Sequence, residues 1–175
     1  MKFLRRLFPG RIAPVAAAPD LPQLFLAVGC VVALQQCMLP TLRRRHEGVA
    51  FLLGGTDGVC AVGLTAVRPK ATTGPGHFHV SASEMARVIA YAMDLDLQIV
   101  AQVHTHPVDA FHSDGDEDGA NIRYDGFISI VLPLYGAHLP EFTGAAIYHC
   151  RGDRWSLLDA TQLVVAPAGV ALDGA

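Results

Sequence analysis

A continuous apolar run of strand length, Leu97 to Val103 (LQIVAQV), constrains the fold more than any other segment of the chain. A strand that is apolar on both faces must be covered on both faces, so we expect it at the centre of a sheet. Phe127 to Leu132 (FISIVL) has the same character and predicts a second central strand. The fold is therefore expected to form around a sheet with buried central strands.

Two helices are expected beside this sheet. A helical period of apolar residues runs over Cys30–Pro40, and Pro40 marks the expected end. This helix leads into a solvated basic turn at Arg43–His46. The second helix is predicted from the N-cap candidates Ser81 and Ser83 to about Asp94.

The remaining elements are shorter. Further strands are expected at Leu24–Val28, Glu47–Gly54, Val59–Val67, Phe142–His149 and Arg154–Leu158. Hairpin turns are expected at Gly55–Gly58 and Arg151–Asp153, and loops, rich in turn-forming residues, at Arg68–His79 and Pro133–Pro140. Together these elements predict an α/β domain with a curved, mostly antiparallel sheet flanked by helices.

Length and composition favour one globular domain. The chain has 175 residues, of which 51% are hydrophobic and 17% charged, and its net charge is −3. This composition argues against a disordered or nucleic-acid-binding protein. Four cysteines lie far apart without a CxxC motif, so we expect reduced thiols and a cytoplasmic protein.

The ends of the chain are expected to lie outside the domain. We predict a flexible, Pro/Ala-rich arm at residues 1–20, a domain at 21–160 and a C-terminal tail at 161–175. Basic and apolar residues alternate in the arm, so contact with a membrane surface stays an alternative role. The apolar run Leu24–Leu39 contains two glutamines and is shorter than the roughly 20 residues that span a bilayer, so no stable membrane insertion is expected.

The segment after the central strand carries the chemistry. Because side chains of a strand alternate, His104 and His106 face the same way and can form a two-histidine metal clip. A catalytic zinc needs three protein ligands and an open position, and the third ligand is often a carboxylate. The following loop supplies Asp109, Asp114, Asp116, Glu117 and Asp118. The alternative interpretation is an acidic calcium-type loop or solvated turn beside two core histidines.

The whole arrangement resembles a known family. His104-Thr105-His106-Pro107, followed by Ser113 and Asp116, resembles the HxHP…SxxD signature of the JAMM (JAB/MPN+) metalloproteases. Glu47–Gly54 (EGVAFLLG) is similar to the family's upstream ExxxxLxG pattern. The resemblance covers roughly residues 22 to 160 and implies a single MPN/JAB-like domain. Ala110–Ser113 (AFHS) looks like bacterial members that accompany ubiquitin-like conjugation operons.

The resemblance also implies roles for these residues. His104, His106 and Asp116 would bind Zn²⁺, Glu47 would act as general base and then general acid, and Ser113 would donate a hydrogen bond to the oxyanion. Nine residues separate His106 from Asp116, one fewer than is usual in the family, and Glu117 would restore the usual count. We expect Asp116 rather than Glu117 because Asp116 preserves SxxD.

The activity implied is that of a deubiquitinase-like zinc isopeptidase or peptidase. It would cleave after the C-terminal tail of a ubiquitin-like protein, in a conjugate or a precursor, in an antiphage conjugation system. The tail is expected as an added strand between the loops at residues 68–79 and 133–141. One alternative is a JAB-type peptidase for sulfur-carrier proteins or small peptides. A second is an MPN-like scaffold without metal ligands, against which the complete set of residues argues. The substrate and the oligomeric state stay open.

Three other polar sites are given lesser roles. His77-Phe78-His79 repeats the HxH pattern but has no correctly spaced acid, so we do not expect it to bind metal. Glu84 is interpreted as a first-turn residue of its helix, favoured by the helix dipole rather than catalytic. His112 is interpreted as a polar loop or sheet residue, and contact with substrate, because it lies next to Ser113, stays an alternative.

Overall fold

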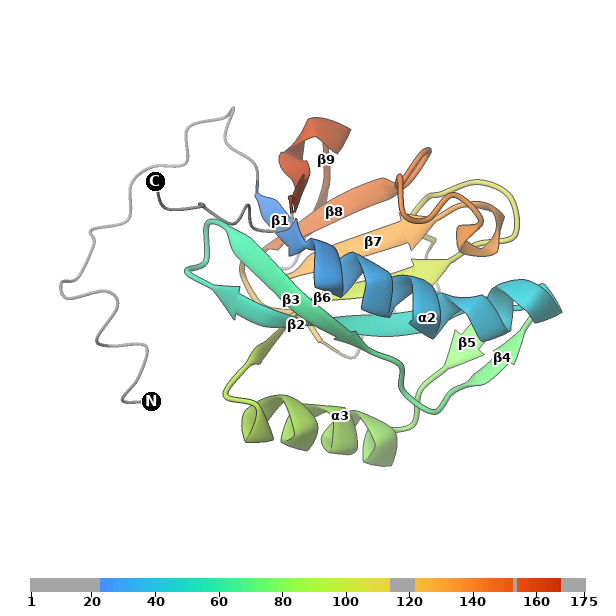
Figure 1. Ribbon diagram of the computed structural model, residues 1–175, viewed down its shortest axis with the longest axis horizontal. Coiled ribbons are helices and arrows are strands. Elements are labelled where there is room, and N and C mark those ends of the chain that lie inside the picture. Colours follow the sequence, from blue (N-terminus) through green and yellow to red (C-terminus); the bar gives the residue numbers. More distant parts are fainter. Residues whose placement is uncertain (1–22, 114–121, 153, 168–175) are drawn as a thin grey trace, which may run out of the picture.

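A strongly curled sheet of eight strands is the frame of the protein (Figure 1). The computed structural model describes residues 23–113, 122–152 and 154–167. The strands of the large sheet are β1 (Leu24–Ala27), β2 (Val49–Thr56), β3 (Ala61–Val67), β6 (Gln98–Thr105), β7 (Ile128–Leu132), β8 (Ala146–Arg151), β9 (Arg154–Leu158) and β10 (Leu163–Ala166). Their spatial order is β10-β1-β3-β2-β6-β7-β8-β9.

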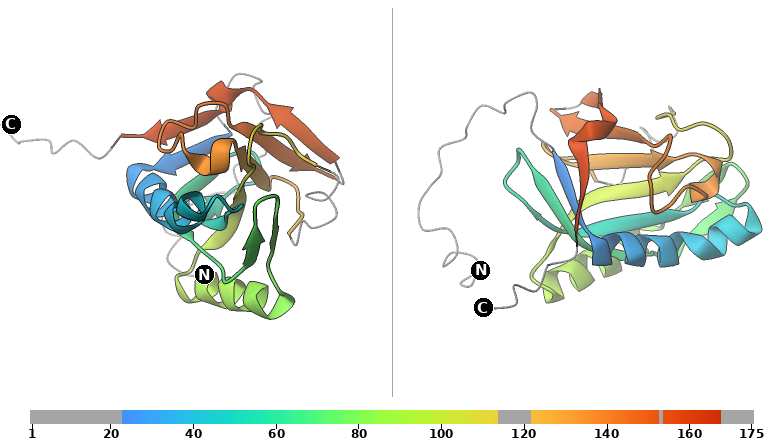
Figure 2. Two further views of the ribbon diagram at one scale, coloured as in Figure 1. Left: turned by 90° about the vertical axis from the view of Figure 1, so that its right-hand side faces the viewer. Right: turned by 45° about the horizontal axis from the view of Figure 1, so that its top comes forward.

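Helices cover both faces of this sheet. Helix α2 (Val28–Arg44) lies on one face and α3 (Ala82–Asp94) on the other (Figure 2). A separate two-stranded sheet consists of β4 (Thr72–Gly74) and β5 (His77–His79). Two short 3₁₀ helices, η1 (Leu134–Gly136) and η2 (Ala160–Gln162), lie in the connections. The expected α/β architecture, with a curved sheet flanked by helices, is confirmed.

The sheet is mixed in direction. Strands β2–β3, β2–β6, β7–β8 and β8–β9 pair antiparallel, whereas β1–β3, β1–β10 and β6–β7 pair parallel. Both predicted central strands occupy central positions. Every residue of β7 is buried, and so is every residue of β6 except Gln98. Coverage on both faces explains why these two segments are continuously apolar.

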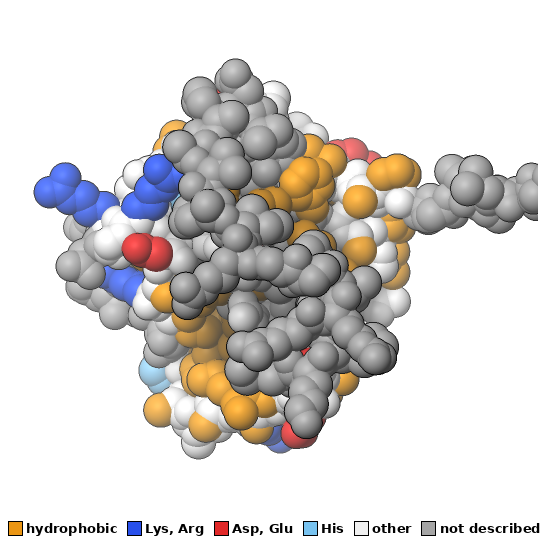
Figure 3. Space-filling model, turned by 90° about the vertical axis from the view of Figure 1, so that its left-hand side faces the viewer, with side chains coloured by type: hydrophobic (Ala, Val, Ile, Leu, Met, Phe, Trp, Pro, Cys, Tyr) orange, Lys and Arg blue, Asp and Glu red, His pale blue; other side chains and the backbone are white. Residues whose placement is uncertain are grey.

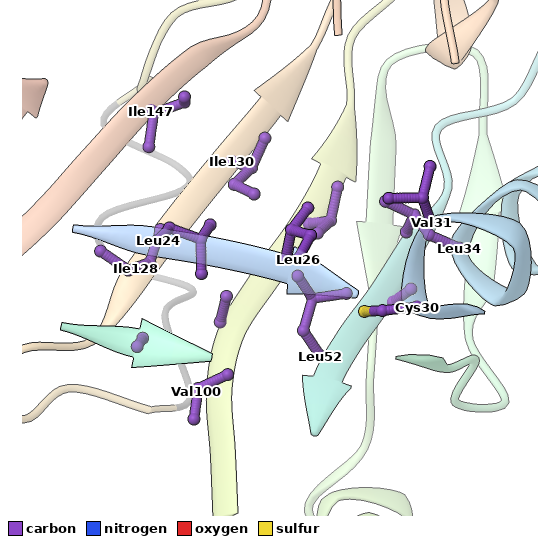
Figure 4. Close-up of a cluster of buried hydrophobic side chains, with 14 of the residues drawn as sticks. Leu24, Leu26, Cys30, Val31, Leu34, Leu52, Val100, Ile128, Ile130 and Ile147 are labelled. Atoms are coloured by element: carbon purple, nitrogen blue, oxygen red, sulfur yellow. The ribbon is translucent and has the colours of Figure 1, made fainter. Parts of the chain in front are cut away.

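The first core lies between the sheet and α2. Alternate residues of the strands point to this face, including Leu52 of β2 and Ile130 of β7, and Cys30 and Leu34 of α2 pack against them (Figure 4). All four side chains are fully buried. Deleting one such large side chain typically costs about 2 to 5 kcal/mol, so this layer contributes strongly to the stability of the fold.

The second core lies on the opposite face, beneath α3. Phe51 and Leu53 of β2 pack with Met85 and Val88 of α3 and with Phe127, which precedes β7. Successive residues of β2 therefore point alternately into the two cores, because the side chains of a strand alternate between the two faces of the sheet. Where β2 begins and β6 ends, buried polar side chains replace the apolar ones on this face.

Helix α2 differs from the expectation at its C-terminus. Pro40 lies inside the helix, which continues to Arg44, so the prediction that Pro40 ends it is wrong. The turn after Pro40 is held by packing, because Thr41 is buried and its Oγ1 donates a hydrogen bond to the carbonyl of Met38. Arg45, in the left-handed region at φ 54°, ends the helix.

Two connections contain more structure than expected. Residues 68–79 are not simply a loop, because β4 and β5 form a hairpin there, closed by Pro75 and Gly76. Glycine- and proline-rich sequences give no alternating pattern, so the sequence does not predict so short a hairpin. Strand β10 lies within residues 161–175, where a tail was expected, and pairs with β1. Residues 1–20 lie outside the described residues.

The surface has both apolar and charged regions. Figure 3 shows the left-hand face of Figure 1, where hydrophobic side chains gather and Lys and Arg side chains lie toward one side. At the C-terminal end of α3, a groove of about 510 Å³ is lined by residues that include Ile89, Met93 and Tyr124.

No helix in the described part of the chain is both long and apolar enough to cross a membrane. All four cysteines are free thiols.

The start of α3 is fixed by two side chains. Ser81 is the N-cap, and its Oγ accepts a hydrogen bond from the backbone N–H of Glu84. The Glu84 carboxylate accepts bonds from the backbone N–H of Lys70 and from the guanidinium of Arg87. These contacts lower the pKa of Glu84 from 4.5 to about 2, Arg87 being the largest cause. The structural role expected for Glu84 is supported, and its carboxylate also anchors the segment before β4.

We expect Glu84→Gln to lower the melting temperature at neutral pH, because a neutral amide loses the charged contacts to Arg87 and Lys70. The folded-state pKa lies below the ordinary value, so the ionised form favours folding. The difference in melting temperature between the variant and the wild type should be largest above pH 4.5 and should shrink as the pH falls toward 2. Thermal unfolding followed by circular dichroism measures it. The exposed Glu141→Gln is the control, and a difference independent of pH would contradict the assignment.

Candidate metal and catalytic site

The two histidines of the HxHP segment lie side by side at the end of β6. His104 is fully buried and His106 is nearly so. Their ring centroids are 5.1 Å apart with the rings inclined at 53°. Thr105, between them, points to the opposite face, where its Oγ1 accepts a hydrogen bond from the N–H of Gly48. The alternation expected from the sequence therefore brings two imidazoles to one point on the α3 side of the sheet.

Strand β2 brings Glu47 to the same point. Val49 pairs with His104, and the backbones of Gly48 and Thr105 are hydrogen-bonded at 3.0 Å. Continuing this antiparallel register sets Glu47 opposite His106, and residues directly opposite each other share a face. Glu47 is 6% exposed, so a carboxylate is held in a sheltered position beside the histidines.

Gly48 permits this close approach. A Cβ atom at position 48 would collide with Oγ1 of Thr41 and lie 3.0 Å from the sulfur of Met38, both in α2. The absence of a side chain lets the start of β2 pass directly under the helix. On the other side, the N–H of Glu47 donates to the carbonyl of Gly74 at the end of β4. Glu47 is thus fixed between α2, β6 and the β4–β5 hairpin.

Ser113 and His112 follow the histidines on the segment that leaves β6. Ser113 is half-buried and is the last residue before the undescribed range 114–121. The ring centroid of His112 lies 6.3 Å from that of His104. The structure therefore places His112 beside the candidate metal ligands.

An aromatic box holds His112. Its ring stacks on Tyr148 of β8 at 4.5 Å and 21°, and meets Trp155 of β9 edge-on at 4.9 Å. Its Nε2 is hydrogen-bonded to Oγ of Ser129 in β7 at 3.0 Å. Its backbone N–H donates to the hydroxyl of Tyr148. Three strands thus fix the position of the residue next to Ser113.

Sequence reasoning did not identify Ser129 and Tyr148 as residues of the site. The one available sign was Ser129, which interrupts the apolar run Phe127–Leu132 with a hydroxyl. Buried hydroxyls in a core strand normally have a specific partner. Nothing in the sequence distinguishes Tyr148 from other strand residues, because aromatic residues are common in strands.

The rim of the site is formed by three connections: the β4–β5 hairpin, the segment after β6 and the connection after β7. Phe78 of β5 lies 5.3 Å from the ring of His104, and the exposed Phe111 meets His106 edge-on at 5.0 Å. Tyr135, in η1, adopts a left-handed conformation, and its N–H donates to the carbonyl of His106. Its hydroxyl donates to the carbonyl of Pro75 at the hairpin turn. The β4–β5 hairpin and the connection after β7 are therefore tied together beside the histidines.

The described residues supply part of a metal-binding set. Two imidazoles converge, and imidazole nitrogens are ligands suited to zinc. Among residues 23–113, 122–152 and 154–167 no group of three or more His, Cys, Asp or Glu side chains is arranged to hold a metal. Asp116 and Glu117, the expected carboxylate ligands, lie outside the described residues together with Asp114 and Asp118. The donors present fit zinc, and the choice of third ligand stays a prediction.

The other polar candidates are separate from this cluster. His77 and His79 are exposed, and Phe78 between them is the residue that approaches His104. His149 is buried on β8, where Nε of Arg151 donates to its Nδ1. Burial, and then the charge of Arg151, lower the pKa of His149. These histidines contribute to the surface and the core rather than to the site.

Comparison with known proteins gives a distant likeness to a metalloprotease. No family model matches the sequence. The chain is 26% identical over 138 residues to "Probable metalloprotease y4jG" of Sinorhizobium fredii, covering 77% of this chain and 85% of that protein. The metalloprotease class is thus supported by a relative.

A solved structure shares the fold. The chain superposes on protein DSY2949 from Desulfitobacterium hafniense with a TM-score of 0.64, covering 83% of this chain and 94% of that one. The two sequences are 13% identical, so this likeness concerns the fold alone.

The aromatic box generates a stability prediction. Tyr148→Phe keeps the stack on His112 but leaves the N–H of His112 without its acceptor, and we expect a loss of about 1 kcal/mol. Tyr148→Leu also removes the stack and should cost a further ~0.5 to 1.5 kcal/mol. Urea unfolding measures both losses.

The exposed Tyr91 on α3 provides the matched control for these variants. Tyr91→Phe should change the free energy of unfolding by less than about 0.5 kcal/mol. Amide exchange at His112 should quicken in both Tyr148 variants. Equal stability of Tyr148→Phe and Tyr148→Leu would show that the stack contributes nothing.

Proposed function

We propose that the protein is a zinc-dependent peptidase that hydrolyses an amide bond with Glu47 as general base. The observation that carries this proposal is the register of β2 with β6, which sets Glu47 opposite His106 and on the same face as His104. The two segments, 57 residues apart in sequence at Gly48 and Thr105, are joined there by one backbone hydrogen bond and one to the Thr105 hydroxyl. A buried carboxylate beside two histidines does little to stabilise a hydrophobic core, whereas a hydrolase needs such a group to transfer a proton. The distant metalloprotease relative supports the same class of activity.

Each group has a distinct part in the reaction. His104, His106 and Asp116 are the residues that would hold the zinc, whose presence supplies Lewis-acid polarisation of the scissile carbonyl and the attacking water. Glu47 accepts the proton of that water and delivers it to the leaving amine. Ser113 donates a hydrogen bond to the oxyanion as the carbonyl becomes tetrahedral, a contact worth ~10²-fold or more in rate. The aromatic box around His112 limits the movement of Ser113.

The proposed substrate is a chain that ends in an extended tail. In the described part of the chain, β4 and β5 pair as strands only with each other, and the carbonyl of Gly74 in β4 is already bonded to Glu47, so the edge of β5 is the one proposed for an added strand. This edge lies beside Phe78 and the histidines. We therefore propose cleavage after the C-terminal tail of a ubiquitin-like protein, from a conjugate or a precursor, as the JAMM resemblance implies.

The pathway is proposed from one short segment of the chain. The AFHS segment, which supplies the boxed His112, is the basis for assigning the enzyme to a bacterial antiphage conjugation system. Processing of sulfur-carrier proteins uses the same catalytic groups and differs in the substrate. Cleavage of ubiquitin-like fusions and of sulfur-carrier fusions by the purified protein, compared side by side, distinguishes the two.

The metal assignment predicts about one zinc per purified chain, measured by elemental mass spectrometry. His104→Ala and His106→Ala should each lose the metal, because removing one of three ligands opens the coordination shell. His77→Ala is the matched control from the exposed HxH pair and should retain zinc. Full activity in metal-free protein would rule out the mechanism.

The third ligand is tested in the same assay by comparing two neighbouring acids. Asp116→Ala should lose metal and activity together, and Glu117→Ala should keep both. The opposite result would move the alignment of the loop by one residue, and the role proposed for Ser113 would then be withdrawn.

The general base is tested separately from the metal. Glu47→Gln keeps the shape of the side chain but cannot take a proton, so zinc content should persist while hydrolysis falls by at least ~10²-fold. The rate of cleavage of a ubiquitin-like fusion and the zinc content are measured on the same sample. Loss of zinc in this variant would identify Glu47 as a ligand or a determinant of the fold.

A further inference from the structure

A basic pocket lies on the flank of the candidate site. It has a volume of about 330 Å³ and lies between the last turns of α2, the start of β2 and the segment before β4. Its walls include Thr41 and Val49 and three cations, Arg44, Arg68 and Lys70. None of the residues that line it is acidic.

The three cations are available to a ligand. Arg44, Arg68 and Lys70 are all exposed. Within the described ranges, the ion pair that the structure records joins Arg87 to Glu84, and none of the three pocket cations takes part in one. Lys70 also contributes a weak attraction that helps to lower the pKa of Glu84, whose carboxylate is already held by Arg87. A local concentration of positive charge on a chain of net charge −3 creates a field that selects anionic ligands.

The pocket is connected to the candidate site through the backbone of the hairpin. Val49, which lines the pocket, pairs with His104. Thr73, which also lines it, is hydrogen-bonded through Oγ1 to Nδ1 of His46 at 3.1 Å. The carbonyl of the next residue, Gly74, accepts a hydrogen bond from the N–H of Glu47. The pocket and the candidate site therefore share two segments of backbone, the start of β2 and strand β4.

We propose that this pocket is a docking site for acidic side chains of the polypeptide substrate. The inference rests on the proposed peptidase function and adds a substrate preference to it: a segment bearing several Asp or Glu residues near the scissile bond. The pocket volume suits one or two side chains rather than a folded surface. No aromatic side chain lines it, so it lacks the stacking platform that a single-stranded nucleic acid requires.

Binding is tested with the full chain and a defined probe, fluorescein-labelled hexaglutamate, with hexaglutamine as the neutral control. Anisotropy at about 50 mM salt, where exposed charges are weakly screened, should show binding of hexaglutamate alone. Arg44→Glu and Arg68→Glu should each weaken binding by about fivefold or more. Arg154→Glu, on β9, is the matched charge reversal and should leave affinity unchanged. Melting temperatures of all three variants verify that they are folded.

Several results would overturn the proposal. Equal binding of hexaglutamate and hexaglutamine would do so, as would equal losses in Arg154→Glu and Arg68→Glu. Tighter binding of hexathymidylate than of hexaglutamate, lost in the same variants, would make the pocket a nucleic-acid site instead. The assay needs no turnover, so hydrolysis of a fusion without hexaglutamate binding overturns the docking site alone. Binding without hydrolysis of any fusion overturns the peptidase function.

Discussion

The antiparallel register between β2 and β6 is the constraint on which the site depends. Val49 opposite His104 sets Glu47 opposite His106, and two hydrogen bonds between Gly48 and Thr105 fix that register at its end. A slip by one residue would turn Glu47 to the α2 face and separate it from the histidines. The same slip would also exchange the residues of the two cores, so the packing of Phe51 and Leu52 on opposite faces protects the site.

Much of the frame could be predicted from the sequence because burial leaves a pattern. The apolar runs of β6 and β7 indicated central strands, and the Ser81 cap indicated the start of α3. The failures occurred where local signals are weak or overridden. Pro40 is a helix breaker by propensity, yet tertiary packing of Thr41 carries α2 to Arg44. Short pairings such as β4–β5 and β10 depend on contacts that no local period reveals.

The candidate site was predictable to the extent that it lies in one segment of chain. His104 and His106 are two residues apart on a strand, so their common face follows from the period of two. The contribution of Glu47 came from a family resemblance, and the ladder of β2 with β6 gives it a physical basis. The box around His112 was not predictable, since Ser129, Tyr148 and Trp155 reach it from three strands.

The two faces of the sheet have different chemical characters, and β2 shows why both are needed. On the α2 side, the strand contributes Ala50 and Leu52 to a hydrophobic core. On the α3 side, the core that begins with Leu53 and Phe51 gives way to Val49 and then Glu47. A carboxylate at this position is sheltered by the hairpin but not enclosed by the core. The stable core therefore holds the strands in register, while the candidate site lies at the strand ends, beside the hairpin and the connection after β7.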